Sequence, residues 1–359
     1  MGKSLFEIIL VIQVISKDIN NVELGFDVVI VGAGAAGCVL AKNLSNKFKV
    51  LVVDSKHFPR RKACSGVLVS EAMDFFKEEL PENTFLQPKE LDIEYVDWDN
   101  KLSKIVKKGF FNASRFALDY FLLNSLKDKE NVTFLENTNV VEFSYAQDKK
   151  HKVVICESSG VIKPIITNYI VGCDGALSAI RKNLTNSSIK FYIGIQELIR
   201  TNKEFDKAIF IFDSEVTDFY SWVIPKSPYV EVGTLLDPYD SRQKFTLLKK
   251  KLKLNYGIEG SGNIDSAVVL RPLSMREIFL GKDNVLLCGE AAGLISPSSA
   301  EGISYAIRSA KYCAEALNED KEALKSYTKK CAPILERLSE KFKKSEIISD
   351  KSKRKVFFQ

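Results

Sequence analysis

Three short stretches of this sequence place glycines beside carboxylates directly after apolar runs. The first is GAGAAG at 32–37, with Asp54 at the end of the next apolar run; the others are GCDG at 172–175 and GEAAG at 289–293. Glycine lets a backbone approach a bound group closely, and an ionised carboxylate only accepts hydrogen bonds, which suits sugar hydroxyls. Together the three stretches predict a site for a long nucleotide cofactor.

The GAGAAG stretch has the arrangement of a dinucleotide-binding loop. It follows the apolar run FDVVIV and opens a helical pattern that extends to about residue 47. The first glycine makes a tight turn, the second admits a pyrophosphate, and the third allows close helix packing, while the helix N-terminus favours phosphate. An acid at the end of the second strand is expected to hold ribose hydroxyls. The residues predicted to contact the cofactor here are Gly32, Gly34, Ala35, Ala36, Gly37, Asp54 and Ser55.

The two later stretches favour FAD over NAD. Both are glycine–acid turns at the ends of predicted strands, and both would bring the chain back beside the first loop. An extended cofactor with a sugar alcohol in its middle requires this arrangement. Glu290 would accept hydrogen bonds from ribityl or ribose hydroxyls. Beyond Pro297, the start of a helix predicted over 300–318 would direct N–H groups at a flavin ring that gains negative charge on reduction. The predicted FAD contacts in these stretches are Asp174, Gly175, Gly289, Glu290, Ala291, Ala292, Gly293, Glu301, Gly302 and Ile303.

In this order and spacing, the three stretches resemble the FAD-dependent oxidoreductases of the p-hydroxybenzoate hydroxylase-like fold. Within that group the chain is similar to the geranylgeranyl reductase family. The closer match lies in FPRRKACSG (58–66), NASRFALDYFLL (112–123) and YSWVIPK (220–226). The resemblance covers roughly residues 26–320 and implies a flavoprotein enzyme.

The RRKACSG loop is where this resemblance implies the reaction chemistry. In such reductases the cysteine faces the substrate pocket, so Cys64 is the candidate general acid, with Lys62 beside it. The alternative is a small buried residue in a tight loop. Ser65 departs from the family pattern, which has a glycine there. Lys62, Ser65 and Gly66 are also predicted to contact the cofactor.

Two further motifs supply candidate site residues, each with a structural alternative. Arg115 is predicted to bind the pyrophosphate or ribose of FAD; a surface salt bridge to Asp119 one helical turn on is the alternative. Alternation along a strand places Tyr220, Trp222 and Ile224 on one face, where they would line an apolar pocket or else pack in the core. The predicted substrate-lining residues are Tyr220, Trp222, Ile224 and Pro297.

Three functions follow from these residues. The favoured one is reduction of a carbon–carbon double bond in an isoprenoid or similar apolar substrate by reduced flavin. The second is an oxygen-using hydroxylase or halogenase, because YSWVIP differs by one residue from the WxWxIP stretch of flavin halogenases. The third is a flavin-binding sensor without catalysis. The sequence contains no second GxGxxG, so the electron donor is NAD(P)H visiting transiently or a ferredoxin-type carrier.

Composition sets limits on other functions. The 359 residues carry a net charge of +6, and the segment 341–355 holds seven basic against two acidic residues, which predicts a solvated, partly disordered end or a peripheral membrane contact. Seven scattered cysteines and two histidines indicate no metal site and a reducing cytoplasm. No nucleic-acid motif is present. The apolar stretch at 5–15 is too short to span a bilayer. The oligomeric state stays open.

These residues require an α/β fold to position them. We predict a Rossmann-like FAD-binding domain with a doubly wound parallel sheet, into which a β-rich substrate domain is inserted. Helices are expected over 69–80, 113–127, 241–253 and 300–318, with buried strands at 26–31, 49–54 and 284–290. The predicted boundaries are an extension at 1–24, a discontinuous FAD-binding domain at 25–82, 109–187 and 276–320, a substrate domain at 83–108 and 188–275, and a basic helical tail at 321–359.

Overall fold

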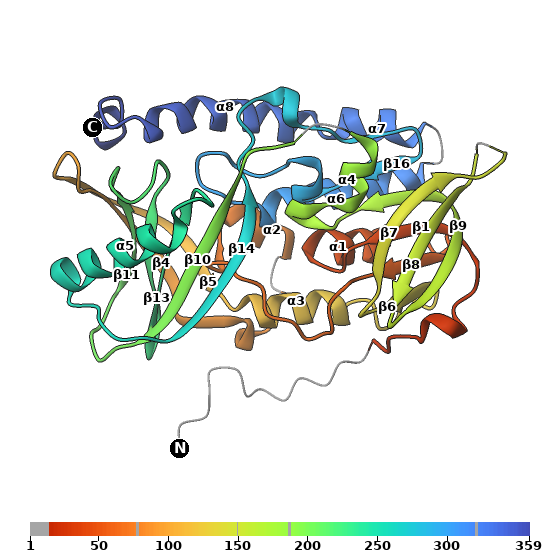
Figure 1. The fold of residues 1–359 in the computed structure, drawn as a ribbon, viewed down its shortest axis with the longest axis horizontal. Coiled ribbons are helices and arrows are strands. Elements are labelled where there is room, and N and C mark those ends of the chain that lie inside the picture. The colour runs from red at the N-terminus through yellow and green to blue at the C-terminus, as the bar shows by residue number, and fades with distance from the viewer. Residues whose placement is uncertain (1–13, 77–78, 149, 186–187, 320–321) are drawn as a thin grey trace, which may run out of the picture.

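Two β-sheets lie side by side and form the two lobes of the protein (Figure 1). The computed structural model describes residues 14–76, 79–148, 150–185, 188–319 and 322–359. The predicted α/β class, a largely parallel sheet beside a β-rich second sheet, is confirmed. Most of the apolar stretch at 5–15 lies outside the described residues.

The first sheet is built on parallel strands that are buried on both faces. Its strand order is β15-β16-β9-β1-β2-β6, and the β7–β8 hairpin pairs with the first half of β9. Val28, Val29 and Ile30 of β1 have no exposed surface, which explains the apolar run that follows Asp27 in the sequence. The strands are β1 (Gly25–Val31), β2 (Val50–Val53), β6 (Val132–Leu135), β7 (Asn139–Tyr145), β8 (Lys152–Ser158), β9 (Val161–Gly172), β15 (Gly281–Lys282) and β16 (Val285–Leu287).

Successive side chains along the strands of the second sheet point to opposite faces, and both faces are apolar. Its order is β14-β10-β13-β12-β11-β4-β5-β3. Val223 and Val232 point to the outer face, where helix α5 packs, whereas Trp222 and Ile224 point to the inner face, toward the loops of the first sheet. The strands are β3 (Val67–Leu68), β4 (Phe85–Asp97), β5 (Leu102–Ala113), β10 (Phe191–Arg200), β11 (Lys207–Phe212), β12 (Ser221–Lys226), β13 (Tyr229–Leu236) and β14 (Asn263–Leu270).

The helices follow the expected pattern with shifted ends. The helix expected at 113–127 begins later because the Ser114 hydroxyl caps it by accepting from Ala117 N–H. The helix expected at 241–253 extends to Tyr256, where Gly257 in the left-handed region ends it. The helices are α1 (Ala35–Asn43), α2 (Ser70–Phe76), α3 (Arg115–Asn124), α4 (Ala179–Leu184), α5 (Ser241–Tyr256), α6 (Ile303–Asn318), α7 (Ala323–Lys330), α8 (Ala332–Ser349) and α9 (Lys355–Phe358).

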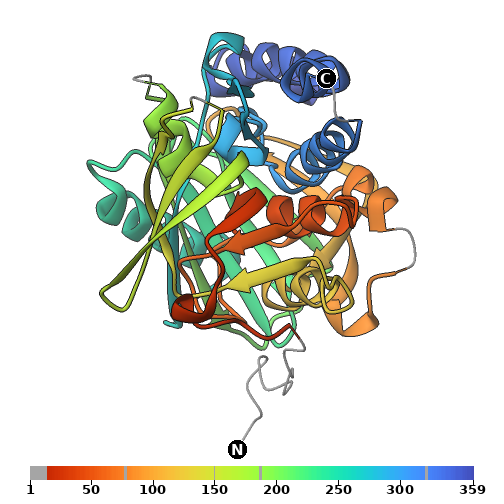
Figure 2. The ribbon, with the colours of Figure 1, turned by 90° about the vertical axis from the view of Figure 1, so that its right-hand side faces the viewer.

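The long helix α8 runs along one side of the molecule and reaches both lobes (Figures 1 and 2). Arg337 of α8 pairs with Glu71 in the first lobe. Arg271, at the end of β14, donates to Ser345 and Ser349 of α8. The expectation of a partly disordered end is therefore wrong, since α8 continues to Ser349 and Arg354 beyond it is only 1% exposed. The expectation of solvated charges holds for Lys343, Lys351, Lys353 and Lys355, which are exposed.

Candidate functional site

The three glycine-rich stretches meet at one edge of the first sheet. Strands β9 and β1 pair in parallel with Gly172 opposite Val31, and β16 pairs with β9 with Leu287 opposite Gly172. Each of these residues ends its strand, so the loops that begin at 32, 173 and 288 leave the sheet side by side. In open parallel sheets, ligands bind in the crevice beyond the carboxyl ends of the strands.

The first loop leaves no room for side chains at its glycines. A Cβ atom on Gly37 would lie 1.8 Å from the Gly32 carbonyl oxygen. Gly32 itself has a φ of +104°, and a Cβ there would lie 2.5 Å from the Cys173 carbonyl oxygen. No side chain caps the N-terminus of α1 at Gly34, so its first N–H groups are not used by a cap. Ala35 and Ala36 are buried in the first turn.

Asp54 shapes this loop from the end of β2. One carboxylate oxygen accepts from Ala33 N–H at 2.8 Å, and the other accepts from Lys56 N–H at 2.9 Å. The Asp54 residue is 8% exposed, while Ser55 is exposed. Because a carboxylate oxygen has two lone pairs, both oxygens retain acceptor capacity. The ribose contact of Asp54 stays a prediction.

The GCDG turn carries an unsatisfied buried oxygen. Asp174 Oδ2 accepts from Ile180 N–H at 3.3 Å, whereas Asp174 Oδ1 is buried and has no hydrogen-bond partner. Burial raises the pKa of Asp174. Gly175, with a φ of +74°, has open space where a Cβ would lie. A buried acceptor without a partner is costly unless a ligand donor meets it, so this turn fits a bound group with hydroxyls.

Glu290 lies in the third loop, where it already holds one backbone group. Glu290 Oε1 accepts from Leu270 N–H at 2.9 Å, which ties the loop to strand β14 of the second sheet. Burial raises the pKa of the Glu290 carboxyl, and the Lys62 ammonium opposes this. Gly289 and Gly293 both have positive φ, which lets the short turn Gly289–Ala292 form against α6.

The start of α6 is capped by the chain itself. Glu301 accepts from Ser304 N–H at 2.8 Å and from the Ser304 hydroxyl at 2.7 Å. The helix begins at Ile303, with Gly302 at its N-cap. The Glu301 carboxylate therefore already accepts a hydrogen bond from one of the N–H groups that were predicted to face a flavin ring. The predicted cofactor contacts of Glu301, Gly302 and Ile303 stay predictions.

A buried group of charges lies beside the first loop. Asp119 is 1% exposed at its side chain and accepts a bidentate contact from Arg115, with Arg115 Nη2 to Asp119 Oδ1 at 2.9 Å. Arg60 Nη2 lies 3.6 Å from Asp119 Oδ2. The salt bridge to Asp119, given above as the alternative to a cofactor contact of Arg115, is thus formed, but it is buried and not at the surface. Burial would raise the pKa of Asp119, but the Arg115 and Arg60 charges lower it overall. Burial would lower the pKa of Arg115, and Asp119 raises it overall.

Arg60 reaches the dinucleotide loop. A Cβ on Gly34 would lie 3.3 Å from Arg60 Nη2, so this guanidinium sits where Gly34 lets the backbone approach a ligand. Arg60 Nε is buried and has no hydrogen-bond partner. Arginine binds phosphate groups strongly through its planar donors. Arg60 is thus placed to contact a pyrophosphate over Gly34.

Cys64 and Lys62 line a small cavity of about 80 Å³ on the inner face of the second sheet. Arg115 and Lys226 also line it, and the Arg115 guanidinium is within hydrogen-bonding reach of the Cys64 thiol. Burial first and the Arg115 charge second lower the pKa of Lys62. The Lys62 side chain is nevertheless exposed to solvent within this cavity, which moderates the effect. The cavity thus holds a half-buried thiol among cationic groups.

Lys226 joins the second sheet to the Cys64 loop. Its ammonium is buried and donates to the Ser65 carbonyl at 2.8 Å and to Asn112 Oδ1 at 3.1 Å. Burial lowers the pKa of Lys226. A Cβ on Gly66, which has a φ of +69°, would lie 2.0 Å from the Ala113 carbonyl oxygen. These contacts fix the path of the loop, so Ser65 contributes its backbone here.

The predicted substrate-lining side chains lie together on the inner face. Tyr220, Trp222 and Ile224 belong to one apolar cluster, and the small cavity is lined by other residues. The Tyr220 hydroxyl donates to the Ser299 carbonyl at 2.7 Å, two residues beyond Pro297. Trp222 Nε1 donates to the buried Glu231 at 3.3 Å. The structure thus brings the motif beside the third loop, and its substrate role stays a prediction.

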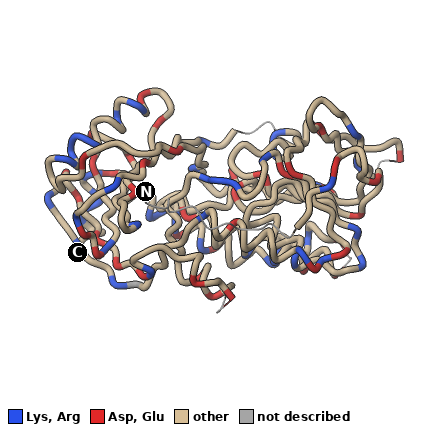
Figure 3. The backbone as a smooth tube through the Cα atoms, turned by 90° about the horizontal axis from the view of Figure 1, so that it is seen from below, with Lys and Arg blue, Asp and Glu red and all other residues tan. Residues whose placement is uncertain are grey.

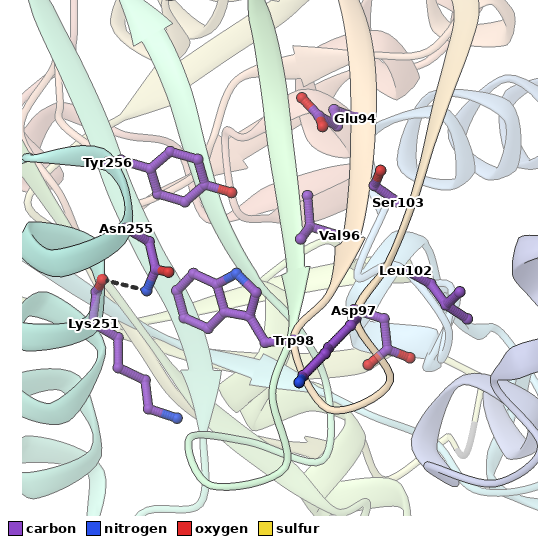
Figure 4. Close-up of a pocket in the computed structure, with 10 residues that line it drawn as sticks. Glu94, Val96, Asp97, Trp98, Leu102, Ser103, Lys251, Asn255 and Tyr256 are labelled. Carbon is purple, nitrogen blue, oxygen red and sulfur yellow. Dashed lines mark hydrogen bonds between the residues drawn. The ribbon is translucent and has the colours of Figure 1, made fainter.

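A larger hollow lies elsewhere, on the outer face of the second sheet. It measures about 590 Å³ and is lined by Trp98, Tyr256 and Lys251 among others. Figure 4 shows the Trp98 and Tyr256 rings side by side, and their centroids are 6.3 Å apart. Lys251 is paired with Asp213 and Glu215. This hollow is separated from the glycine-rich loops by the second sheet, so size alone does not mark the site.

Other kinds of site find no support among the described residues. No group of three or more His, Cys, Asp or Glu side chains in this part of the chain is arranged to hold a metal ion. No described helix is both long and apolar enough to cross a membrane. Basic and acidic segments are interspersed over both lobes (Figure 3).

Sequence reasoning missed Arg60, Asn112 and Glu231. Arg60 stood within the quoted FPRRKACSG motif, and Glu231 stands as a lone acid in an apolar strand, which is a usable signal for a buried functional or structural carboxylate. Asn112 opens the quoted NASRFALDYFLL motif, but that motif gave no sign of its contacts with Lys226 and with the carbonyls of Pro88 and Pro225.

Comparisons with known proteins agree with this geometry. Residues 25–208 match the model of the FAD binding domain family. Protein CbrA of Shigella dysenteriae serotype 1 (strain Sd197) is 32% identical over 308 residues, which cover 83% of this chain and 86% of that protein.

Two solved structures share the fold. A geranylgeranyl bacteriochlorophyll reductase-like protein from Thermoplasma acidophilum has a TM-score of 0.79 at 16% identity and covers 90% of this chain and 88% of its own. The flavin-dependent halogenase CmlS has a TM-score of 0.67 at 17% identity and covers 89% of this chain and 63% of its own. At such identities the likeness concerns the fold alone.

Proposed function

We propose that this chain reduces carbon–carbon double bonds of an isoprenoid or similar apolar substrate. The premise is that the chain belongs to the FAD-binding domain family and to the family of CbrA. The coarser statement needs no proposal: the chain is an FAD-binding oxidoreductase. The observation that carries the proposal is the cavity on the inner face, lined by Cys64 and Lys62, together with the apolar cluster of Tyr220 and Trp222 on the same face. Glu231 connects the two, because it lines the cavity and accepts from Trp222 Nε1.

The residues beyond the first sheet fit FAD. Arg60 and the uncapped start of α1 would hold the pyrophosphate over Gly34, because both present N–H donors there. Asp174 Oδ1, buried without a partner, would accept a hydroxyl of the cofactor. Glu290 would keep its bond to Leu270 and accept a second donor. When bound and reduced, FAD would supply a hydride to the substrate.

The residues of the small cavity would supply the proton. Reduction of a double bond adds a hydride to one carbon and a proton to the other, and Cys64 is the acid proposed to donate that proton, with water restoring the thiol. Arg115 and Lys62 would stabilise the thiolate left behind, because opposite charge favours the ionised form. Lys226 would position the loop through the Ser65 carbonyl. The electron donor, NAD(P)H or a ferredoxin-type carrier, stays open.

The second candidate is an oxygen-using hydroxylase or halogenase. It is favoured by YSWVIP at 220–225, which is one residue away from a stretch that flavin halogenases share. The loop RRKACSG differs from the corresponding halogenase stretch, and this difference ranks the reductase first.

Anaerobic reoxidation tests the proposal. The holoprotein, reduced with dithionite, is mixed with geranylgeranyl lipids, and the return of oxidised flavin absorption is followed together with product mass. We expect reoxidation with a gain of two hydrogens per double bond, and a Cys64→Ser variant that keeps FAD but slows by about a hundredfold.

Three outcomes separate the candidates. Absence of reoxidation by any prenyl compound would contradict the reductase. Oxygen-dependent NAD(P)H consumption with oxygenated or halogenated product would establish the second candidate. If Cys64→Ser and Trp222→Ala left every turnover and affinity unchanged, the flavin sensor reading would stand instead.

A further inference from the structure

A row of aromatic side chains runs along the inner face of the second sheet away from the third loop. Tyr220, anchored to the Ser299 carbonyl, lies 6.4 Å from Trp222 and 5.0 Å from Phe210, measured between ring centroids. Phe210 lies 5.7 Å from Tyr95. The row therefore begins beside the third loop with Tyr220 and Trp222, at the start of β12. It crosses Phe210 on β11 and reaches Tyr95 on β4.

Two residues of the 350–359 segment complete this row. The Phe357 ring lies 5.1 Å from Tyr95 and 6.1 Å from Phe212. The Phe358 ring lies 6.1 Å from Phe212. Both packing angles are edge-to-face, the arrangement that aromatic pairs prefer. An apolar chain lying along the row from the flavin end would meet these two rings at its far end.

A buried arginine fastens the 350–359 segment. Arg354, 1% exposed, donates from Nε to Asp97 Oδ2 at 2.8 Å and from Nη2 to Asp99 Oδ2 at 2.5 Å. Its guanidinium also lies over the Phe212 ring, 5.1 Å from the centroid. Asn100 adds a hydrogen bond to the Lys351 carbonyl at 2.9 Å. Most of these anchoring groups lie at the β4–β5 turn or on β11, at the far end of the aromatic row, and α8 adds the Ile348 carbonyl, which accepts from Arg354 Nη1 at 3.3 Å.

The contacts that hold the 350–359 segment can be released together if the whole segment moves away from the sheet. The attraction within a buried ion pair is largely offset by desolvation, so displacing the whole segment, which returns both partners to water, costs much less than deleting one partner. Val356 on α9 is 65% exposed, so this short helix lies at the surface with one side toward solvent. A ligand that replaces the Phe357 and Phe358 rings on the sheet would recover their apolar contacts.

We propose that Phe357 and Phe358 form the distal wall of the substrate site and set the length of apolar chain that it accepts. This inference rests on the proposed function, because it assumes an apolar chain that starts at the flavin. A chain that ends before these rings binds without disturbing them. A longer chain must displace the 350–359 segment and loses the Arg354 contacts.

The test compares two chain lengths on the FAD-loaded protein. Binding of farnesol and geranylgeraniol is measured by isothermal titration, with no turnover required, for the unaltered chain and the double variant Phe357→Ala/Phe358→Ala. We expect geranylgeraniol to bind about tenfold tighter to the double variant, a change of about 1.4 kcal/mol, while the affinity for farnesol changes less than about twofold. A chain that ends at Ser349 should show the same selectivity, and the double variant keeps Arg354 in place should that truncation not fold.

Val356→Ala is the matched control, because it shortens an exposed side chain of the same helix. It should leave both affinities unchanged. If the double variant changes the affinity for both prenols equally, or for neither, the proposed role of the two rings is overturned. Farnesol binding to the unaltered chain would in that case still support the proposed function. If the unaltered chain binds neither prenol and the variant binds neither, the proposed function fails and this inference fails with it.

Discussion

The two faces of the second sheet are built from alternate residues of the same strands, yet they differ in kind. The outer face carries the larger hollow, about 590 Å³, beside Trp98 and Tyr256. The inner face carries a cavity of only about 80 Å³, but it gathers Cys64, Lys62 and the buried Lys226.

The difference shows that buried polar groups without a partner, and not volume, mark the candidate site, because the outer hollow is also lined by a buried charge, Asp97, but this charge is paired with Arg354. Keeping ionisable groups out of water is costly, and such groups persist where they are paired or where they serve a ligand. On the outer face Lys251 has Asp213 and Glu215 as partners, so its charge is already accounted for. Toward the inner crevice, Asp174 Oδ1 and Arg60 Nε are buried without partners.

The largest expected effect comes from removing the buried carboxylate beside the first loop. Asp119→Ala leaves the Arg60 and Arg115 charges without their counter-ion and should lower the free energy of unfolding by about 3–5 kcal/mol, with loss of FAD binding. Glu215→Ala on the outer face removes an exposed partner of Lys251 and should change little. Urea unfolding of both variants measures the contrast. Equal losses would mean that the buried charges beside the first loop matter no more for stability than the exposed pair on the outer face.

A smaller effect is expected from Arg60. Arg60→Met keeps the side-chain length but removes the donors over Gly34, and should raise the dissociation constant for FAD about ten- to a hundredfold. Arg242→Met, an exposed arginine of α5 on the outer face, should leave it unchanged. Titration of the apoprotein with FAD gives both constants. Unaltered FAD affinity in Arg60→Met would remove Arg60 from the site.

The pH dependence of stability should also report on the buried charges beside the first loop. The pKa of Asp119 is lowered in the folded protein, so its ion pairs contribute fully above the ordinary carboxyl value of about 3.9 and are lost as pH falls through the folded pKa. Stability should therefore decline below about pH 4, and Asp119→Asn should flatten that part of the curve. Chemical unfolding between neutral and acid pH measures it. The same slope in both proteins would contradict the assignment.

The smallest expected effect is a change in the fluorescence of one of the two tryptophans, which lie on opposite faces of the second sheet. An apolar ligand such as farnesol should change the emission of Trp222 and leave that of Trp98 unchanged. The variants Trp98→Phe and Trp222→Phe each keep one of them, so a fluorescence titration separates their responses. A response confined to the protein that keeps Trp98 would move the substrate to the outer face.

Much of the nucleotide-binding sheet could be predicted from sequence because its rules are local. An apolar run followed by GAGAAG and a helical pattern fixes a strand, a turn and a helix start, and Val31, Gly172 and Leu287 are indeed in register. The alternation at 220–226 likewise placed Tyr220, Trp222 and Ile224 in one cluster.

What could not be predicted depends on contacts between distant segments. Arg354 reaches Asp97 across 257 positions of the chain, and Lys226 reaches Ser65 across 161. No local pattern reports such pairs, so the 341–355 charges were read as a solvated end although one of them is buried. The Arg115–Asp119 pair, considered only as a surface alternative, is likewise buried, since helical spacing shows that two residues meet and not what covers them.

Thiol labelling tests most directly the claim that the flavin meets the inner face at Cys64. Cys64 is half-buried, whereas the other six cysteines are buried, so the apoprotein should show one fast-reacting thiol with N-ethylmaleimide, absent in Cys64→Ser. We predict that saturating FAD slows this reaction at least about tenfold, because the bound ring would cover the thiol. Labelling of Cys64 at the same rate with and without bound FAD would contradict the account.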